Sequence, residues 1–157
     1  MSLARSKRIG ESVEAAVIQR IDELAPESSR DAHVDATVET TIDASAALPT
    51  VGLPVLEAGT GVEIKSCGVV LASQRRGRYK LRQTQHEYLL DESAVYLFVV
   101  TPPHDSTPLA LKVVPATVVD GVISGWVETE RRSPYAQVSW GRFFDAEELD
   151  PDAGGDR

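Results

Sequence analysis

Two residues of opposite charge stand two positions apart in an apolar run near the middle of the chain. Residues 62–65 read Val-Glu-Ile-Lys, and Gly61 and Gly68 bracket the run. In a β-strand, side chains i and i+2 point to the same face. Glu63 and Lys65 would therefore project side by side, opposite an apolar face. Because burying two charges is costly unless they pair or hold a metal, such a strand is a candidate site.

A second carboxylate could join this pair. Residues 51–58 and 61–71 read as two extended runs joined by a Gly-rich connection, which predicts a β-hairpin. In that hairpin Glu57 would lie opposite Glu63, with Cβ atoms about 5 Å apart. Two carboxylates this close repel unless a cation lies between them. Mg²⁺ accepts such ligands, and a metal, two carboxylates and Lys65 are the parts that phosphodiester hydrolysis requires.

The elements that must position these residues follow from hydrophobic spacing. Apolar residues at helical intervals predict a helix over residues 10–24, and residues 83–90 read as another. The continuous apolar run of residues 95–101 is typical of a buried strand. Further strands are predicted over residues 33–42, 109–114 and 135–140, with a loop over 43–50 and a short helix over 116–124. This order predicts an α/β fold, a mixed central β-sheet with a motif-bearing hairpin, flanked by helices.

Size and composition set the class of protein. The 157 residues suffice for one domain, predicted over residues 1–149, and residues 150–157 read as an acidic flexible tail. No apolar run approaches the roughly 20 residues of a membrane span, and the N-terminus lacks the apolar region of a secretory signal. We therefore expect a cytoplasmic protein without a membrane partner. A lone Cys67 excludes an internal disulfide.

The net charge is −8, and only four of the 16 basic residues are lysines. This composition resembles that of proteins from halophilic archaea or their viruses, whose acidic surfaces keep them soluble in concentrated salt. An acidic total would otherwise argue against nucleic acid as a partner.

Glu57 followed by the Glu-x-Lys of residues 63–65 resembles the active-site hairpin of the PD-(D/E)xK nuclease superfamily, which has the restriction-endonuclease-like fold. As a layout the resemblance covers residues 10–115, and its specific motifs lie near residues 54–90. It implies that Glu57 and Glu63 bind Mg²⁺ (or Mn²⁺) and that Lys65 helps water attack the phosphate.

The same resemblance implies supporting residues. Many members carry an acid on the first helix, and Glu14 matches best, with Glu11 next. Many also place a polar residue on the helix after the motif strand, where Gln85 matches best, then Gln83. Asp43 is the alternative to Glu57 as first acid, because some members space their acids more widely.

A basic run follows the motif. Five positive charges fall within eight residues of this acidic chain: Arg75, Arg76, Arg78, Lys80 and Arg82. If the segment is extended, the last three share one face. They would neutralise phosphates and position nucleic acid, most plainly DNA. The alternative reading is a solubilising loop whose charges pair with the many acids.

The motif taken alone has an ordinary explanation. Glu-x-Lys is common on solvated strand faces, where the ion pair is worth roughly 0–1 kcal/mol. Together with the hairpin, the first helix and the basic run, it favours a Mg²⁺-dependent nuclease acting on DNA. The family resemblance implies a homodimer where both strands are cut. A catalytically inactive nucleic-acid-binding or assembly protein that retains the fold is the alternative function.

Overall fold

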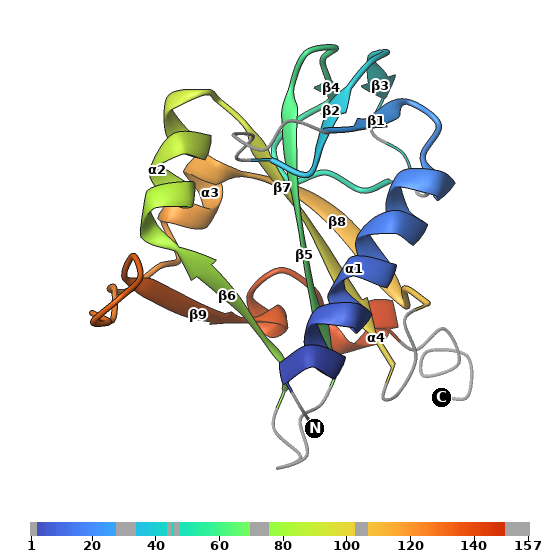
Figure 1. Cartoon of the computed structure of the whole chain (residues 1–157). Coiled ribbons are helices and arrows are strands. Elements are labelled where there is room, and N and C mark those ends of the chain that lie inside the picture. Colours follow the sequence, from blue (N-terminus) through green and yellow to red (C-terminus); the bar gives the residue numbers. More distant parts are fainter. Residues whose placement is uncertain are drawn as a thin grey trace.

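A five-stranded mixed sheet runs through the molecule (Figure 1). Its strands lie in the order β1 (Leu24–Pro26), β2 (Ala36–Val38), β5 (Gly61–Gly68), β7 (Val95–Thr101) and β8 (Ala110–Pro115). β5 and β7 pair in parallel, whereas the other neighbours pair antiparallel. This computed structural model describes residues 3–27, 34–43, 45, 48–69, 76–102 and 107–149.

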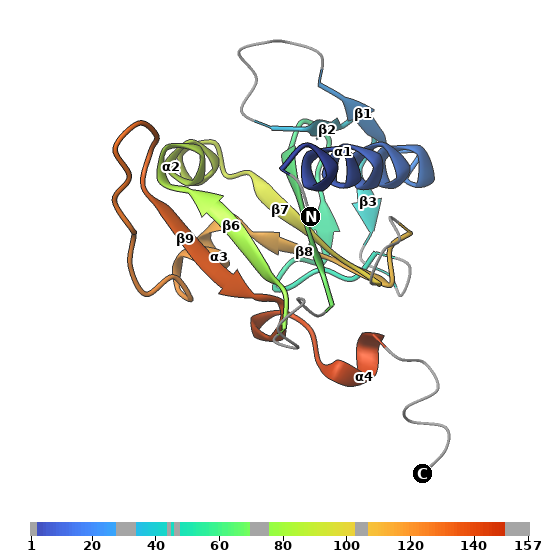
Figure 2. The ribbon, with the colours of Figure 1, turned by 60° about the horizontal axis from the view of Figure 1, so that its bottom comes forward.

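Helices and two small strand pairs complete the fold. The helices are α1 (Leu3–Arg20), α2 (Gln83–Asp91), α3 (Ala116–Asp120) and α4 (Ala146–Leu149), with a 3₁₀ turn at Trp140–Arg142. β3 (Ile42–Asp43) pairs with β4 (Val55–Leu56), and β6 (Arg78–Arg82) pairs with β9 (Tyr135–Ser139). In Figure 2, α1 lies on one side of the sheet and the β6–β9 pair on the other. The predicted α/β class, a mixed sheet flanked by helices, is confirmed.

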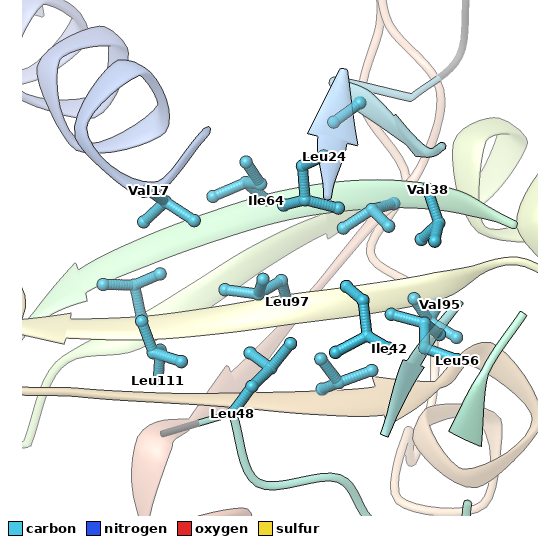
Figure 3. Close-up of a cluster of buried hydrophobic side chains, with 14 of the residues drawn as sticks. Val17, Leu24, Val38, Ile42, Leu48, Leu56, Ile64, Val95, Leu97 and Leu111 are labelled. Carbon is cyan, nitrogen blue, oxygen red and sulfur yellow. The ribbon is translucent and has the colours of Figure 1, made fainter. Parts of the chain in front are cut away.

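One face of the sheet forms an apolar core with α1. The residues of β5 that alternate toward this face, Val62 and Ile64, are buried with Leu97 of β7 and with Val13 and Val17 of α1. Figure 3 shows Val17 and Ile64 in the same cluster of side chains, together with residues of β1 to β4. The apolar spacing of the first helix and the alternation of β5 therefore serve the same core.

The opposite face is covered by the connection from β5 to β7. Two parallel strands need a crossover, and here it consists of β6 and α2. Tyr96 and Phe98 of β7 are buried on this face with Tyr79 and Leu81 of β6 and Leu89 of α2. The Glu63 and Lys65 side chains alternate toward this second face, so the crossover brings α2 over them.

Most predicted elements are present with altered ends. The predicted strand at 95–101 is β7, all of it buried, and the helix predicted at 83–90 is α2. The first helix ends at Arg20, before the predicted end, and Leu24 lies instead in β1. Leu24 is buried in the core although it lies in a strand, so its apolar side chain extends the helical spacing beyond the end of α1. The predicted strand at 33–42 is broken into β2 and β3 by a bend.

The predicted hairpin between residues 51–58 and 61–71 is wrong. Within residues 51–58 only Val55–Leu56 is a strand, and it pairs with β3. The Gly-rich turn binds β2 instead, because the Gly59 amide donates to the Val38 carbonyl at 2.7 Å and the Val38 amide donates to the Thr60 carbonyl at 3.0 Å. β5 consequently pairs with β2 on one side and β7 on the other.

Two sequence predictions fall wholly or partly outside the described residues. The tail at 150–157 and Arg75 are among the residues that the structure does not describe. The extent of the domain stays a prediction. No helix in the described part of the chain is long and apolar enough to cross a membrane.

Gly77 allows a close backbone contact between β5 and the segment leading to β6. A Cβ at this position would overlap the carbonyl oxygen of Gly68. The neighbouring backbone is fixed, because the Gly77 amide donates to the Val69 carbonyl at 3.3 Å and its carbonyl accepts from the Trp140 amide at 3.2 Å. We expect Gly77→Ala to lower the free energy of unfolding by about 2 kcal/mol, measured by urea denaturation.

Gly125→Ala is the matched control, since no atom lies within 4 Å of a Cβ built there. That change is expected to be neutral or to stabilise by about 0.5 kcal/mol. Equal effects of the two substitutions would contradict the importance of the contact at Gly77.

Candidate active site

β5 places an acid and an amine together on the face covered by α2. Lys65 Nζ lies 3.2 Å from Glu63 Oε2. Glu63 is only 5% exposed, whereas a pair on a solvated strand face would be open to water. The predicted side-by-side arrangement is confirmed, and the reading as an ordinary surface ion pair does not apply.

Asp35 is the carboxylate that faces Glu63. β2 and β5 pair with Ala36 opposite Val62, and Asp35 directly precedes Ala36 at the end of β2. The Asp35 amide donates to the Val62 carbonyl at 3.0 Å, and its Oδ2 accepts from the Ile64 amide at 2.8 Å. The Asp35 side chain therefore satisfies a β5 amide just beyond the end of β2 and lies beside Glu63.

The crossover helix supplies a third polar group. Gln85, in the first turn of α2, donates through Nε2 to Glu63 Oε2. Gln83 begins the same helix, and its backbone amide donates to the Pro134 carbonyl at 2.8 Å. Of the two glutamines considered from sequence, Gln85 is the one that contacts the acid.

The environment of Glu63 disfavours its ionised form. Burial raises the pKa of Glu63 from 4.5 to about 8, with further increases from a hydrogen bond to Asp35 and from the negative charge of Asp35, while Lys65 acts in the opposite direction. At neutral pH the metal-free site therefore retains a proton. A cation bound between the two carboxylates would stabilise the ionised form of Glu63 and so displace that proton. Carboxylate oxygens are ligands that suit Mg²⁺ or Mn²⁺.

A buried polar chain underlies the site. His86, 1% exposed, has Nδ1 2.8 Å from the Tyr96 hydroxyl and Nε2 3.0 Å from Asp120 Oδ1. Since a carboxylate only accepts, Nε2 carries a proton, and in the neutral ring Nδ1 accepts from Tyr96. These bonds join α2, β7 and α3 next to Gln85, and so they fix the helix that carries the glutamine.

The two acids predicted to complete the site lie elsewhere. Glu57 is exposed in the turn after β4, and Asp43 is exposed at the end of β3. Asp43 ends β3 and Glu57 directly follows β4, and the β3–β4 pair is separate from the sheet that holds Glu63. The charged groups that shift the pKa of Glu63 are Lys65 and Asp35. The placement of Glu57 opposite Glu63 is wrong because β5 takes β2 as its partner.

Asp35 was missed from the sequence, although the sequence carries a signal for it. The strand prediction put Val34, Ala36 and Val38 on one face, and Asp35 is the acid that alternates to the other face. Glu63 stands in the same relation to Val62 and Ile64. In the structure the alternation breaks next to Asp35, because Val34 packs against the second core whereas Ala36 and Val38 lie in the core with α1. Only the pairing of β2 with β5 brings the two acids together.

The helix residue predicted to support the site lies on α1. Glu14 is half-buried and follows Val13, whose side chain is in the core on the α1 face of the sheet. The side chain of Glu11, the other candidate, is not among those described. A supporting role for Glu14 stays a prediction.

The basic run is extended as predicted over β6. Arg78 and Lys80 are exposed and Arg82 is half-buried, whereas Tyr79 and Leu81 between them face the core. Arg76 lies over the Trp140 ring, 4.5 Å from its centroid. The three cations of β6 thus share one outward face.

The acidic part of the site consists of two carboxylates. Among the described residues there is no group of three or more His, Cys, Asp or Glu side chains that could hold a metal. Two carboxylates are nevertheless sufficient for Mg²⁺, which usually keeps several waters and binds substrate phosphate.

Comparison with known proteins agrees with this geometry. The sequence model of the PD-(D/E)XK nuclease superfamily domain matches residues 1–145. A search of curated proteins and a search of solved structures each gave no match. The match extends over nearly the whole chain, from α1 through the 3₁₀ turn after β9. This chain belongs to the PD-(D/E)XK nuclease superfamily.

Proposed function

We propose that the protein is a metal-dependent nuclease that hydrolyses phosphodiester bonds in DNA. The observation that carries the proposal is the meeting of Asp35, Glu63 and Lys65 on one buried strand face, with Gln85 donating to Glu63. Membership of a nuclease superfamily supports the reaction class. The remaining parts of the proposal are the metal, the role of each residue and the DNA substrate.

Asp35 and Glu63 would hold Mg²⁺ or Mn²⁺. Both are oxygen donors, and the raised pKa of Glu63 reflects first its burial and then the nearby Asp35. When bound, the ion polarises the phosphate and lowers the pKa of a water molecule. Asp43 and Glu57 are left out of this ligand set because both are exposed and lie at the separate β3–β4 pair.

The other residues act through charge and position. The Lys65 amine lies 3.2 Å from Glu63, where it can orient the attacking water and offset charge that develops on the phosphate. Gln85 and Lys65 both contact Oε2 of Glu63, so they hold the carboxyl group from two sides of the sequence motif. Arg76, Arg78, Lys80 and Arg82, together with Arg75, would contact backbone phosphates. Because the chain supplies one such site, cutting both strands would take two copies, and we include a homodimer in the proposal.

Lys65→Ala is expected to lower the cleavage rate by a factor on the order of 10²–10³, since it removes one group that stabilises transition-state charge. The measurement is cleavage of plasmid and oligonucleotide DNA with Mg²⁺ or Mn²⁺, at low and high salt, with EDTA as the metal-free reference.

Lys112→Ala is the matched control. Lys112 lies on the same face of the sheet in β8, but it binds Glu148 at 2.8 Å and the Phe143 carbonyl at 2.8 Å. Its loss should affect stability and leave the cleavage rate of the folded protein unchanged. Equal rates for wild type and Lys65→Ala would contradict the role of Lys65.

The main argument for the alternative function, a non-catalytic member that binds nucleic acid or assists assembly, no longer applies. It rested on a first acid out of position, and Asp35 lies beside Glu63. Intact DNA binding without cleavage under every metal and salt condition would favour that alternative.

A further inference from the structure

β6 and β9 form a two-stranded antiparallel ribbon whose outward side chains come from two distant parts of the sequence. Their register pairs Arg78 with Ser139, Lys80 with Gln137 and Arg82 with Tyr135. The alternate residues of both strands face the core. The outward residues, here called the ribbon face, are Arg78, Lys80, Arg82, Tyr135, Gln137 and Ser139.

The charge of the ribbon face is opposite to that of the whole protein. The chain has a net charge of −8, yet the ribbon face carries three cations and no carboxylate. Within the part of the chain that the structure describes, Arg78 and Lys80 form no ion pair with an acid. The reading of this run as a loop neutralised by nearby acids therefore does not apply to these two residues. Unpaired cations on an acidic protein suit a polyanionic partner.

The cations divide into two kinds. Arg82 is held internally, because its Nη1 donates to the Ser133 carbonyl at 2.8 Å and its guanidinium lies 5.6 Å from the Tyr135 ring centroid. Arg78 and Lys80 are exposed, and so is Gln137 across from Lys80. Arg78 and Lys80 are therefore the residues available to an incoming phosphate.

The single aromatic residue of the ribbon face argues for a duplex rather than a single strand. Single-stranded nucleic acid is usually bound by free aromatic rings on which bases stack. Here Lys80 Nζ lies 4.6 Å from the Tyr135 centroid, and Arg82 also lies over that ring. The ring already has cationic partners. A two-stranded ribbon, in turn, fits the major groove of a duplex.

The ribbon leads directly to the catalytic residues. Arg82 is the N-cap residue of α2, and Gln85 in the first turn of that helix contacts Glu63. In Figure 1, the arrowhead of β6 runs into α2. The Thr84 amide also donates to Ser133 Oγ at 3.0 Å, which ties the start of α2 to the segment before β9. A duplex on the ribbon face would thus lie next to the helix that contacts the site.

We propose that the ribbon face is the surface that docks duplex DNA. Arg78 and Lys80 neutralise backbone phosphates, and Gln137 of β9, opposite Lys80, leaves a neutral gap on this face. This inference rests on the proposed function for its choice of partner. It narrows the basic run to two residues and adds β9, a strand outside that run, to the binding surface.

Salt dependence of binding tests the inference. The affinity of a fluorescent duplex is measured by anisotropy at several salt concentrations, in the Lys65→Ala background and with EDTA present to prevent cleavage. Each phosphate contact contributes about 0.9 to the slope of log affinity against log salt. Arg78→Gln with Lys80→Gln should therefore lower that slope by about 2 and weaken binding by about 10-fold or more.

A substitution that adds charge guards against loss of fold. Gln137→Lys should raise the slope by about 1 and tighten binding, because it fills the neutral gap. Two controls change charge at exposed positions of α1, on the other side of the sheet: Arg20→Gln, compared per charge removed, and Gln19→Lys. Both controls should leave the slope nearly unchanged. A single strand of the same length should bind more weakly than the duplex.

The outcomes separate this inference from the proposed function. Equal slopes for the ribbon variants and their controls, or tighter binding of the single strand, would overturn the inference even if the protein cleaves DNA. Ribbon-dependent duplex binding by a protein that cleaves nothing would leave the inference standing and overturn the nuclease proposal.

Discussion

Asp35→Asn is expected to abolish metal-dependent DNA cleavage, with a loss on the order of 10³-fold or more. Changes to residues that merely orient a metal ligand typically lower affinity or activity by about 10- to 100-fold, and loss of a ligand itself should exceed that. Asparagine retains a carbonyl oxygen that can accept from the Ile64 amide, which Asp35 Oδ2 binds at 2.8 Å. The substitution therefore removes the Asp35 carboxylate beside Glu63 and keeps the hydrogen bond from the Ile64 amide.

The matched controls are Glu57→Gln and Asp43→Asn, each of which also removes one carboxylate from an exposed position. Both should cleave DNA at the wild-type rate, and both should keep the wild-type dependence on Mg²⁺ concentration. Titration of Mg²⁺ against the cleavage rate should show weakened metal binding for Asp35→Asn alone. Loss of activity in Glu57→Gln with full activity in Asp35→Asn would instead restore the hairpin acid as a ligand.

Glu63→Gln is expected to stabilise the metal-free protein at pH 8 while it destroys activity. The pKa of Glu63 is raised from 4.5 to about 8, mainly by burial and then by Asp35, so the folded state holds a proton that the unfolded state loses near pH 4.5. The contribution of Glu63 to stability is thus fully present below pH 4.5 and is lost as the pH rises through about 8. Glutamine imitates the protonated form at every pH.

Urea denaturation in EDTA at pH 5 and pH 8 would measure this effect. The free energy of unfolding of wild type should fall between the two values by an amount on the order of a few kcal/mol, and that of Glu63→Gln should fall much less. Adding Mg²⁺ at pH 8 should stabilise wild type and leave the variant unchanged, since binding to the folded state alone raises stability. A wild type whose stability is flat from pH 5 to pH 8 would contradict the raised pKa.

Local patterns were sufficient for most of the fold. The apolar run of residues 95–101 gave a strand buried on both faces, as expected for a member of a parallel pair. The alternation in residues 62–65 placed Glu63 and Lys65 on a common face, which the 3.2 Å separation confirms. These properties depend on side-chain periodicity, and periodicity can be read along the chain.

The choice of strand partner could not be read in that way. A Gly-rich turn predicts a hairpin because its flanking segments are close in sequence, and this favoured Glu57 as the partner of Glu63. The energy of pairing also depends on which apolar side chains a strand brings to the core, and β2 brings Ala36 and Val38, both buried. β2 therefore pairs with β5, and this pairing places Asp35 beside Glu63.

The alternation of β5 assigns its two faces to separate tasks. The α1 face receives the apolar side chains of Val62 and Ile64 from this strand, and the α2 face holds the acid and the amine. Substitution of Glu63 or Lys65 would leave the packing of the α1 face unchanged. A descendant of this chain could consequently lose catalysis by a single substitution and persist as a well-folded binding protein. Folding alone is therefore poor proof of activity for relatives with this architecture, and the identities of residues 35, 63 and 65 are the features to inspect first.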